Sequence, residues 1–215
     1  MCFEHAESPP VSTLPAKDNG VITFCSFNKP CKINDTVLDL WSEVLRAVPG
    51  SRLKLKFKNY WAIPAVHQPV LERFDANGIP PERITLISTE DNFHDHLGHY
   101  ADADIALDPF PFNGATTTFQ ALWMGVPVIS LLGDRFISRA GGSISTHAGL
   151  GDLVAGTPEA YIDNAVALAA NLPRLEGLRA SLRGRIEQSS ICDAPGYAAN
   201  VEKAFLDMWK AFQPS

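Results

Sequence analysis

The feature that most constrains the fold of this chain is an alternation of short β-rich runs with segments of helical pattern. Helical spacing of apolar residues, closed by Gly or Pro, marks segments such as 37–48 and 64–76. The β-rich runs cover residues 21–27, 52–57, 83–88, 104–108 and 126–132. Strands that alternate with helices form parallel sheets through right-handed crossovers. The sequence therefore predicts an α/β fold, a Rossmann-like, doubly wound parallel sheet.

The two ends of the chain differ from this central pattern. Residues 1–20 contain three prolines and no periodicity, so we expect a linker or truncated edge there. Residues 21–213 then form one domain. Beyond residue 132 the pattern is helical, and we expect helices near residues 135–140, 158–170, 173–188 and 195–212.

Composition excludes several function classes. The formal net charge is −6 with no basic run, which argues against nucleic-acid binding. The four cysteines show neither a C-x-x-C pair nor Cys/His ligand spacing, so no metal or redox site is expected. No apolar run approaches the roughly 20 residues of a membrane span. The first residues do not resemble a secretion signal, and we expect a cytoplasmic protein.

Three turns follow the carboxyl ends of predicted strands, where ligands of open α/β sheets bind. The first turn carries Lys29 and Lys32, whose charges suit a phosphate group. The second is followed by His96. We do not expect a metal site there, because the nearby histidines do not share one helical face. Alone, each signal fits an ordinary surface residue. Their convergence on one sheet edge is what favours a site.

The third turn carries the strongest signal. It reads Asn113-Gly114-Ala115-Thr116-Thr117-Thr118 between a strand and a helix. Glycine permits close backbone approach, and a helix start offers free N–H groups and a positive dipole end to an anion. A capped helix after a tight turn would explain the same residues without any ligand.

Other site types find little support. Asp102 and Asp104 resemble the Asp-x-Asp metal site of some sugar transferases, but they precede a strand and lie at the wrong end of it. Neither the G-x-G-x-x-G pattern of dehydrogenases nor the G-x-S-x-G pattern of serine hydrolases occurs where it would be needed.

Three longer motifs resemble one known family. They are FCSFNK with Lys32-Ile33, the HLxxY motif that starts at His96, and the run IALDPFPFNGATTT from residue 105. The motif ALWMGVPVI from residue 121 and the pair Ser138-Arg139 extend the match, which covers about residues 21–213. These motifs are similar to those of the O-linked N-acetylglucosaminyltransferase and SPINDLY family, especially its bacterial members.

The resemblance implies the carboxyl-terminal, nucleotide-sugar-binding half of a GT-B glycosyltransferase. Such enzymes are inverting and metal-independent, so no cofactor is expected, and they transfer N-acetylglucosamine from UDP-N-acetylglucosamine to Ser or Thr of proteins. Lys32 resembles the lysine that neutralises the diphosphate leaving group, and His96 the histidine that packs on the nucleobase. Thr116 and Thr117 resemble the hydroxyl and N–H donors to the diphosphate. The full set expected to bind the nucleotide sugar is Lys29, Lys32, His96, Phe112, Asn113, Gly114, Ala115, Thr116, Thr117 and Gln120.

The chain also departs from the family pattern. Gln120 stands where an acidic residue usually bonds the ribose hydroxyls, and Ala115 replaces a residue that is often His or Thr. Lys29 stands where the family usually has Gln or another polar residue. A GT-B site lies between two Rossmann-like halves, and only one is present in these residues. The resemblance therefore implies two further parts, an N-terminal half that contacts the acceptor and tetratricopeptide repeats. We expect the last helix, with Trp209 and Phe212, to expose apolar surface.

Alternatives stay open at this point. A nucleotide-binding regulatory module without catalysis fits the departure at Gln120. Another GT-B enzyme, such as a nucleotide-sugar epimerase, would keep Lys32 and the threonine run. Within the family, GDP-fucose is an alternative donor. The oligomeric state and the acceptor protein do not follow from these residues.

Overall fold

A six-stranded, fully parallel sheet forms the centre of the molecule. The computed structural model describes residues 7–89 and 91–213. The strand order is β3-β2-β1-β4-β5-β6, in which the chain winds outward from β1 in both directions. The strands are β1 (Thr23–Ser26), β2 (Arg52–Lys56), β3 (Ile84–Ile87), β4 (Ile105–Leu107), β5 (Val128–Leu131) and β6 (Val154–Ala155). The predicted doubly wound α/β fold is confirmed. The sixth strand was not predicted, because two residues carry no readable alternation.

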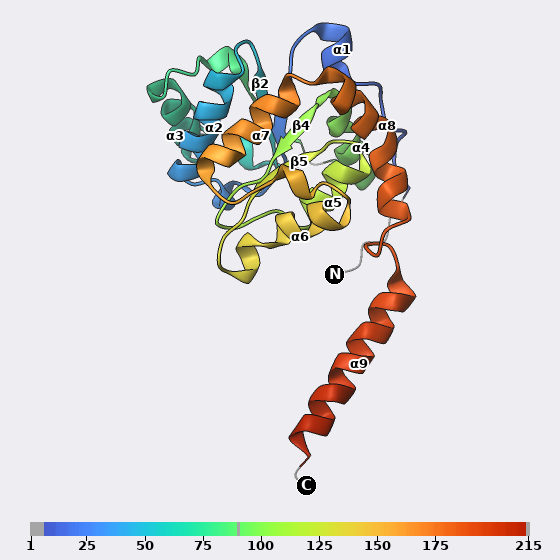
Figure 1. Ribbon diagram of the computed structural model, residues 1–215. Coiled ribbons are helices and arrows are strands. Elements are labelled where there is room, and N and C mark those ends of the chain that lie inside the picture. Colours follow the sequence, from blue (N-terminus) through green and yellow to red (C-terminus); the bar gives the residue numbers. More distant parts are fainter. Residues whose placement is uncertain (1–6, 90, 214–215) are drawn as a thin grey trace.

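Helices cover both faces of this sheet (Figure 1). On one side α2 (Asp35–Ala47) packs against α3 (Pro64–Ala76) and α7 (Pro158–Ala169). On the other side α5 (Thr116–Trp123) packs against α6 (Ala140–His147) and α8 (Leu172–Glu187). The short helix α4 (Phe93–Gly98) follows β3. The central strands are buried on both faces, which explains their continuous apolar runs.

The core contains a polar contact that joins two layers. Trp41 of α2 and Tyr161 of α7 are fully buried, and the Trp41 indole N–H donates to the Tyr161 hydroxyl at 3.1 Å. The Tyr161 hydroxyl in turn donates to the backbone carbonyl of Asp108 at 3.2 Å. Buried polar groups of this kind need partners, and this pair ties helices α2 and α7 to the end of β4.

The prediction of a linker or truncated edge over residues 1–20 is wrong for residues 14–19, and residues 1–6 lie outside the described part of the chain. A short helix, α1 (Pro15–Asn19), buries Ala16, and Leu14 just before it is also buried. The Asp104 carboxylate accepts hydrogen bonds from the N–H groups of Ala16 at 2.9 Å and Thr23 at 2.8 Å. Sequence periodicity did not reveal α1, because the helix is held in place by hydrogen bonds to the distant Asp104 carboxylate. The same bonds give Asp104 a structural role, consistent with its position at the amino end of β4.

The predicted helix at 135–140 is also corrected. Only a 3-10 turn, Phe136–Ser138, occurs there, and α6 begins at Ala140.

The last helix, α9 (Ala194–Phe212), is present as expected and extends away from the sheet (Figure 1). None of its residues is buried, and Trp209 and Phe212 are exposed. No helix within the described residues combines the length and apolar character that a membrane crossing requires.

Candidate nucleotide-sugar site

A cavity of about 410 Å³ opens at the carboxyl ends of β1 and β2, facing the start of α5. This volume lies within the usual range for small-molecule sites. Four residues predicted from the sequence line it: His96, Thr116, Thr117 and Gln120. The other lining residues are Phe27, Lys56, Phe57, Lys58, Thr89, Asp91 and Phe93. The sheet edge predicted to carry the site therefore does hold a cavity.

The loop between β4 and α5 is held by a buried carboxyl group. Asp108 is 1% exposed, accepts from the Gly114 N–H at 2.6 Å and accepts from the Ser130 hydroxyl at 3.0 Å. Burial raises the pKa of Asp108 to about 7, although the two hydrogen bonds and Lys32 oppose that rise. Asp108 thus fixes the backbone that leads into α5.

Only glycine fits at position 114. A Cβ atom there would lie 2.6 Å from the Thr117 hydroxyl oxygen, 2.7 Å from that of Thr118 and 3.0 Å from Asp108 Oδ1. These distances are below normal contact, so the loop could not stay as close to the first turn of α5. The glycine predicted to permit a close backbone approach therefore does so here, because its backbone lies against Asp108 and the first turn of α5.

The start of α5 presents backbone donors. The first backbone bond of the helix runs from the Phe119 N–H to the Ala115 carbonyl, so the N–H groups of Thr116 to Thr118 have no partner within the helix. The Thr117 hydroxyl donates to Asn28 Oδ1 at 2.9 Å. Its hydrogen is therefore committed to the turn after β1, and at Thr117 the backbone N–H is the donor left for an anion.

Lys32 links the first and third turns. Its ammonium group donates to the Asn113 carbonyl oxygen at 2.8 Å and lies 4.2 Å from the centre of the Phe112 ring. Burial lowers the pKa of Lys32, while the nearby Asp108 acts in the opposite direction. The ammonium has three donors and uses one on Asn113, so further donors can meet a ligand beside this loop.

His96 and Gln120 contact each other across the cavity. His96 Nε2 lies 3.2 Å from Gln120 Oε1, and its other nitrogen, Nδ1, lies 3.1 Å from the Lys56 ammonium. Burial, followed by the charge of Lys56, lowers the pKa of His96, so the neutral ring is favoured. The ring also makes edge contacts with Phe27 and Tyr100.

Six of the ten predicted residues do not line the cavity: Lys29, Lys32, Phe112, Asn113, Gly114 and Ala115. Lys29 is exposed, and its ammonium lies 5.8 Å from the Tyr60 ring centre. The Asn113 side chain is buried under the loop and donates to the Pro109 carbonyl at 2.9 Å, so Asn113 faces Lys32 only through its backbone. Phe112 and Ala115 lie on the loop between Lys32 and α5 and do not line the cavity.

Comparison with known proteins agrees with this geometry. The model of the family "Glycosyl transferase family 41" matches residues 12–201. The chain belongs to this family. The rice (Oryza sativa subsp. japonica) protein named "Probable UDP-N-acetylglucosamine--peptide N-acetylglucosaminyltransferase SPINDLY" is 38% identical over 99% of the chain. The Arabidopsis thaliana protein of the same activity name with the suffix SEC is 29% identical over 86% of the chain.

A solved structure shows the same fold. The O-GlcNAc transferase mutant K341M of Thermobaculum terrenum superposes with a TM-score of 0.84 at 37% identity, over 95% of this chain and 39% of that one. The predicted assignment to a GT-B glycosyltransferase is confirmed by this likeness and by the family match. The chain spans only 23% of the length of its rice relative and 19% of the length of the SEC relative.

Sequence reasoning missed two charged residues of this candidate site. Lys56 is 2% exposed and ends β2 inside the cavity, and Asp91 pairs with it at 2.9 Å. The β-rich run over residues 52–57 predicts a strand, but it assigns no role in a site to Lys56. A readable signal existed, because Lys56 ends a strand just as Lys32 follows one. Among residues 7–89 and 91–213, no three His, Cys, Asp or Glu side chains gather to hold a metal ion.

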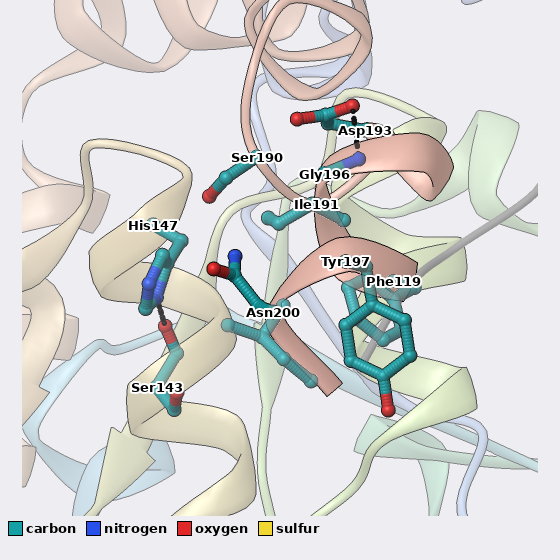
Figure 2. Close-up of a pocket in the computed structure, with 10 residues that line it drawn as sticks. Phe119, Ser143, His147, Ser190, Ile191, Asp193, Gly196, Tyr197 and Asn200 are labelled. Carbon is teal, nitrogen blue, oxygen red and sulfur yellow. Dashed lines mark hydrogen bonds between the residues drawn. The ribbon is translucent and has the colours of Figure 1, made fainter. Parts of the chain in front are cut away.

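A second cavity, of about 240 Å³, lies where α9 joins the domain (Figure 2). Its walls come from α5, α6, the loop before α9 and the start of α9, and Figure 2 shows Asn200 of α9 on the side of His147 and Tyr197 on the side of Phe119. It contains none of the residues predicted for the nucleotide sugar. With no lysine or arginine in its lining, it lacks the cation that a diphosphate would require.

Proposed function

We propose that this chain is the donor-binding half of an inverting, metal-independent protein O-glycosyltransferase that uses UDP-N-acetylglucosamine. One observation carries the proposal: the Lys32 ammonium is fixed on the Asn113 carbonyl, beside the free N–H groups that begin α5. A cation and a helix N-terminus next to each other form a site for a diphosphate. Family membership and the printed names of the relatives support the same donor.

The chemistry follows from where charge develops. In the transfer, the oxygen of a Ser or Thr hydroxyl would form a bond to the sugar C1 while the bond between C1 and the diphosphate oxygen breaks. The electron pair of the broken bond would go to the leaving group, and the hydroxyl proton would go to water or to a base on the additional chain. Lys32 and the N–H groups of Thr116 and Thr117 would stabilise the growing negative charge, as preorganised donors do in other enzymes. A divalent metal is not required in this scheme, because the ammonium and the amides supply the positive charge.

The other end of the nucleotide would lie against His96. A neutral, partly buried imidazole that already packs edge-on to Phe27 and Tyr100 offers a flat surface for a uracil ring. Gln120, which is hydrogen-bonded to His96, would then reach the ribose hydroxyls. The remaining predicted residues, Phe112, Gly114 and Ala115, would shape the loop over the diphosphate.

We propose further that transfer requires additional chain. The residues here match about a quarter of the rice relative, and acceptor binding would come from an N-terminal Rossmann-like half with tetratricopeptide repeats. The apolar face of α9, with Phe205, Met208 and Trp209 more than half exposed, would pack on that half. An exposed apolar surface of this kind indicates a contact site.

Calorimetric titration with UDP tests the donor site directly. We expect the chain to bind UDP, the Lys32→Ala variant to bind it more weakly, and the Lys29→Ala variant to bind it like the wild type. Lys29 is a matched control because it is an exposed lysine of the same turn whose ammonium lies near the Tyr60 ring, whereas that of Lys32 is held on the Asn113 carbonyl. Absence of UDP binding, or equal losses in both variants, would refute the proposed site. A parallel titration with GDP distinguishes the GDP-fucose alternative.

A nucleotide-binding module without catalysis is the second candidate, favoured by Gln120 in place of an acidic residue. A sugar-transfer assay separates the two functions when the N-terminal half is supplied in the same chain. UDP binding without transfer under that condition would favour the module.

A further inference from the structure

Lys56 is a buried ammonium group with no role in the proposed scheme so far. Its side chain is 2% exposed at the end of β2. It contacts Asp91 Oδ2 at 2.9 Å and His96 Nδ1 at 3.1 Å. Removing a lysine from water is costly unless the charge is paired and hydrogen-bonded. A buried lysine at the end of β2 is therefore expected to serve either the function or the structure of the cavity that it lines.

Asp91 organises the group around Lys56. Its Oδ2 atom also accepts from the Thr89 hydroxyl at 2.8 Å and contacts His99 Nε2 at 2.9 Å. These hydrogen bonds, that of Lys56 first, lower the pKa of Asp91 to about 2. Asp91 is therefore an anion at neutral pH, and it holds the Lys56 ammonium in one place.

The hydrogen-bond roles of His96 follow from its neighbours. An ammonium group can only donate, so His96 Nδ1 must accept and cannot carry a hydrogen while it contacts Lys56. The neutral ring then carries its hydrogen on Nε2, which faces Gln120 Oε1 at 3.2 Å. This bond occupies one lone pair of the Gln120 oxygen and fixes which end of the amide faces His96, so the amide nitrogen is the end left to face a ligand.

The charged and titratable groups that face His96 come from three elements. Lys56 ends β2, His99 begins the turn after α4, and Asp91 precedes α4. Lys56 and His99 disfavour the imidazolium form, and Asp91 favours it. Three further groups pack on the ring. Phe27, just after β1, and Gln120 of α5 are uncharged, and Tyr100, in the turn that His99 begins, stays protonated because burial raises its pKa well above its ordinary value.

We propose that Lys56, held by Asp91, is a positioning residue that fixes His96 in its neutral tautomer with the hydrogen on Nε2 and so turns the donor end of Gln120 toward the nucleotide. The inference rests on the proposed function in one respect, the placement of a nucleobase on His96. It adds a specificity consequence: the ribose meets an N–H₂ donor at residue 120 instead of an acceptor.

Nitrogen NMR of the histidine rings tests the first half of the proposal without any nucleotide. We expect the wild type to show His96, assigned with a His96→Gln variant, as the Nε2–H tautomer. Lys56→Met should raise the pKa of His96 and mix its tautomers, whereas Asp91→Asn should lower that pKa. A purely structural disturbance would not give opposite shifts. Lys54→Met is the matched control, because Lys54 lies on the same strand but pairs with Asp102 at 3.0 Å.

Calorimetry with UDP tests the second half. Because the terminal phosphate of UDP itself titrates at about pH 6, the affinity of each variant is compared with that of the wild type at the same pH. Relative to the wild type, Lys56→Met should lose UDP affinity as the pH is lowered, because its His96 becomes protonated. The loss should reach up to about tenfold for each unit by which the bound uracil ring lowers the pKa of His96. An unchanged tautomer and pKa of His96 in Lys56→Met would overturn this inference. The proposed function, which is tested by UDP binding to the wild type, would be unaffected. Loss of UDP binding by the wild type would instead overturn the proposed function, and the NMR result would stand separately. Should Lys56→Met not fold, Asp91→Asn alone decides: an unchanged or raised pKa of His96 overturns the inference.

Discussion

The ammonium group of Lys32 donates a hydrogen bond at 2.8 Å to the carbonyl of Asn113, a residue 81 positions away in the sequence. The bond joins the turn after β1 to the loop before α5. It places the ammonium group of the proposed diphosphate site next to helix N–H groups that have no partner within the helix. The first prediction follows from this relationship.

Lys32→Ala should lower the turnover number far more than it raises the Michaelis constant for the donor, in an enzyme that contains both halves. Loss of one preorganised donor to a developing charge costs a factor of about 10²–10³. Steady-state kinetics with UDP-N-acetylglucosamine measures both constants. The Lys29→Ala control should change neither. A variant with unchanged turnover and weaker binding would contradict the assigned role of Lys32.

Gly114→Ala should destabilise the domain by about 1–3 kcal/mol, the usual cost of overpacking. The added methyl group would lie 2.6 Å from the Thr117 hydroxyl oxygen and 3.0 Å from Asp108 Oδ1. Urea unfolding measures the effect. Gly177→Ala is the matched control: it lies inside the exposed face of α8 with open space around it. That control should gain roughly 0.5–1 kcal/mol, so the two variants should shift in opposite directions.

Asp108 should make stability fall as pH rises. Its pKa in the folded chain is about 7, above the ordinary value of 3.8, because burial penalises the charged form. The folded state therefore holds the proton more tightly than the unfolded state. The stability linked to this proton is complete below about pH 4 and is lost as pH rises through 7.

The matched variant for that pH effect is Asp108→Asn. An amide can still accept from the Gly114 N–H, but it does not ionise. Relative to this variant, the wild type should lose a few kcal/mol between pH 4.5 and 8, on the order of 1.4 kcal/mol for each unit of the pKa shift. Unfolding curves across that pH range measure the difference. Parallel curves for the two proteins would show that Asp108 does not ionise with a raised pKa.

Gln120→Glu should strengthen UDP binding. A carboxylate accepts hydrogen bonds from ribose hydroxyls and from His96 at once, and charged hydrogen bonds exceed neutral ones by about 1 kcal/mol. Affinity should therefore rise roughly fivefold. Titration with 2′-deoxy-UDP provides the control, because the gain should shrink when one hydroxyl is absent. Equal gains for both nucleotides would place the new carboxylate away from the ribose.

Deletion of residues 201–213 should leave the melting temperature of the domain unchanged, since α9 has no buried residue. Ile186→Ala, which truncates a fully buried side chain at the end of α8, should cost about 2–5 kcal/mol. Calorimetric melting compares the two. A large loss of stability from the deletion would mean that α9 packs on this domain in solution.

The sequence by itself determined the sheet, most of the helices and the edge that carries the site. Alternating β-rich and helical segments are local patterns, and ligand positions at strand ends follow from topology alone. For these reasons Lys32, His96, Thr116 and Thr117 could be proposed from the sequence, whereas Gln120 was added by the family resemblance. The Gly114 turn was equally readable, because its residue types have special backbone properties.

Only the tertiary structure decided how those residues act. It buried Lys56 beside His96, placed Asp91 between Lys56 and His99, and used the Thr117 hydroxyl on Asn28. It also folded α1 onto Asp104, 88 residues from Ala16, where local periodicity gave no signal. Each of these facts depends on side chains from distant segments that meet in space. A strand pattern records which positions tend to be buried, but it does not record which partner makes a buried charge stable.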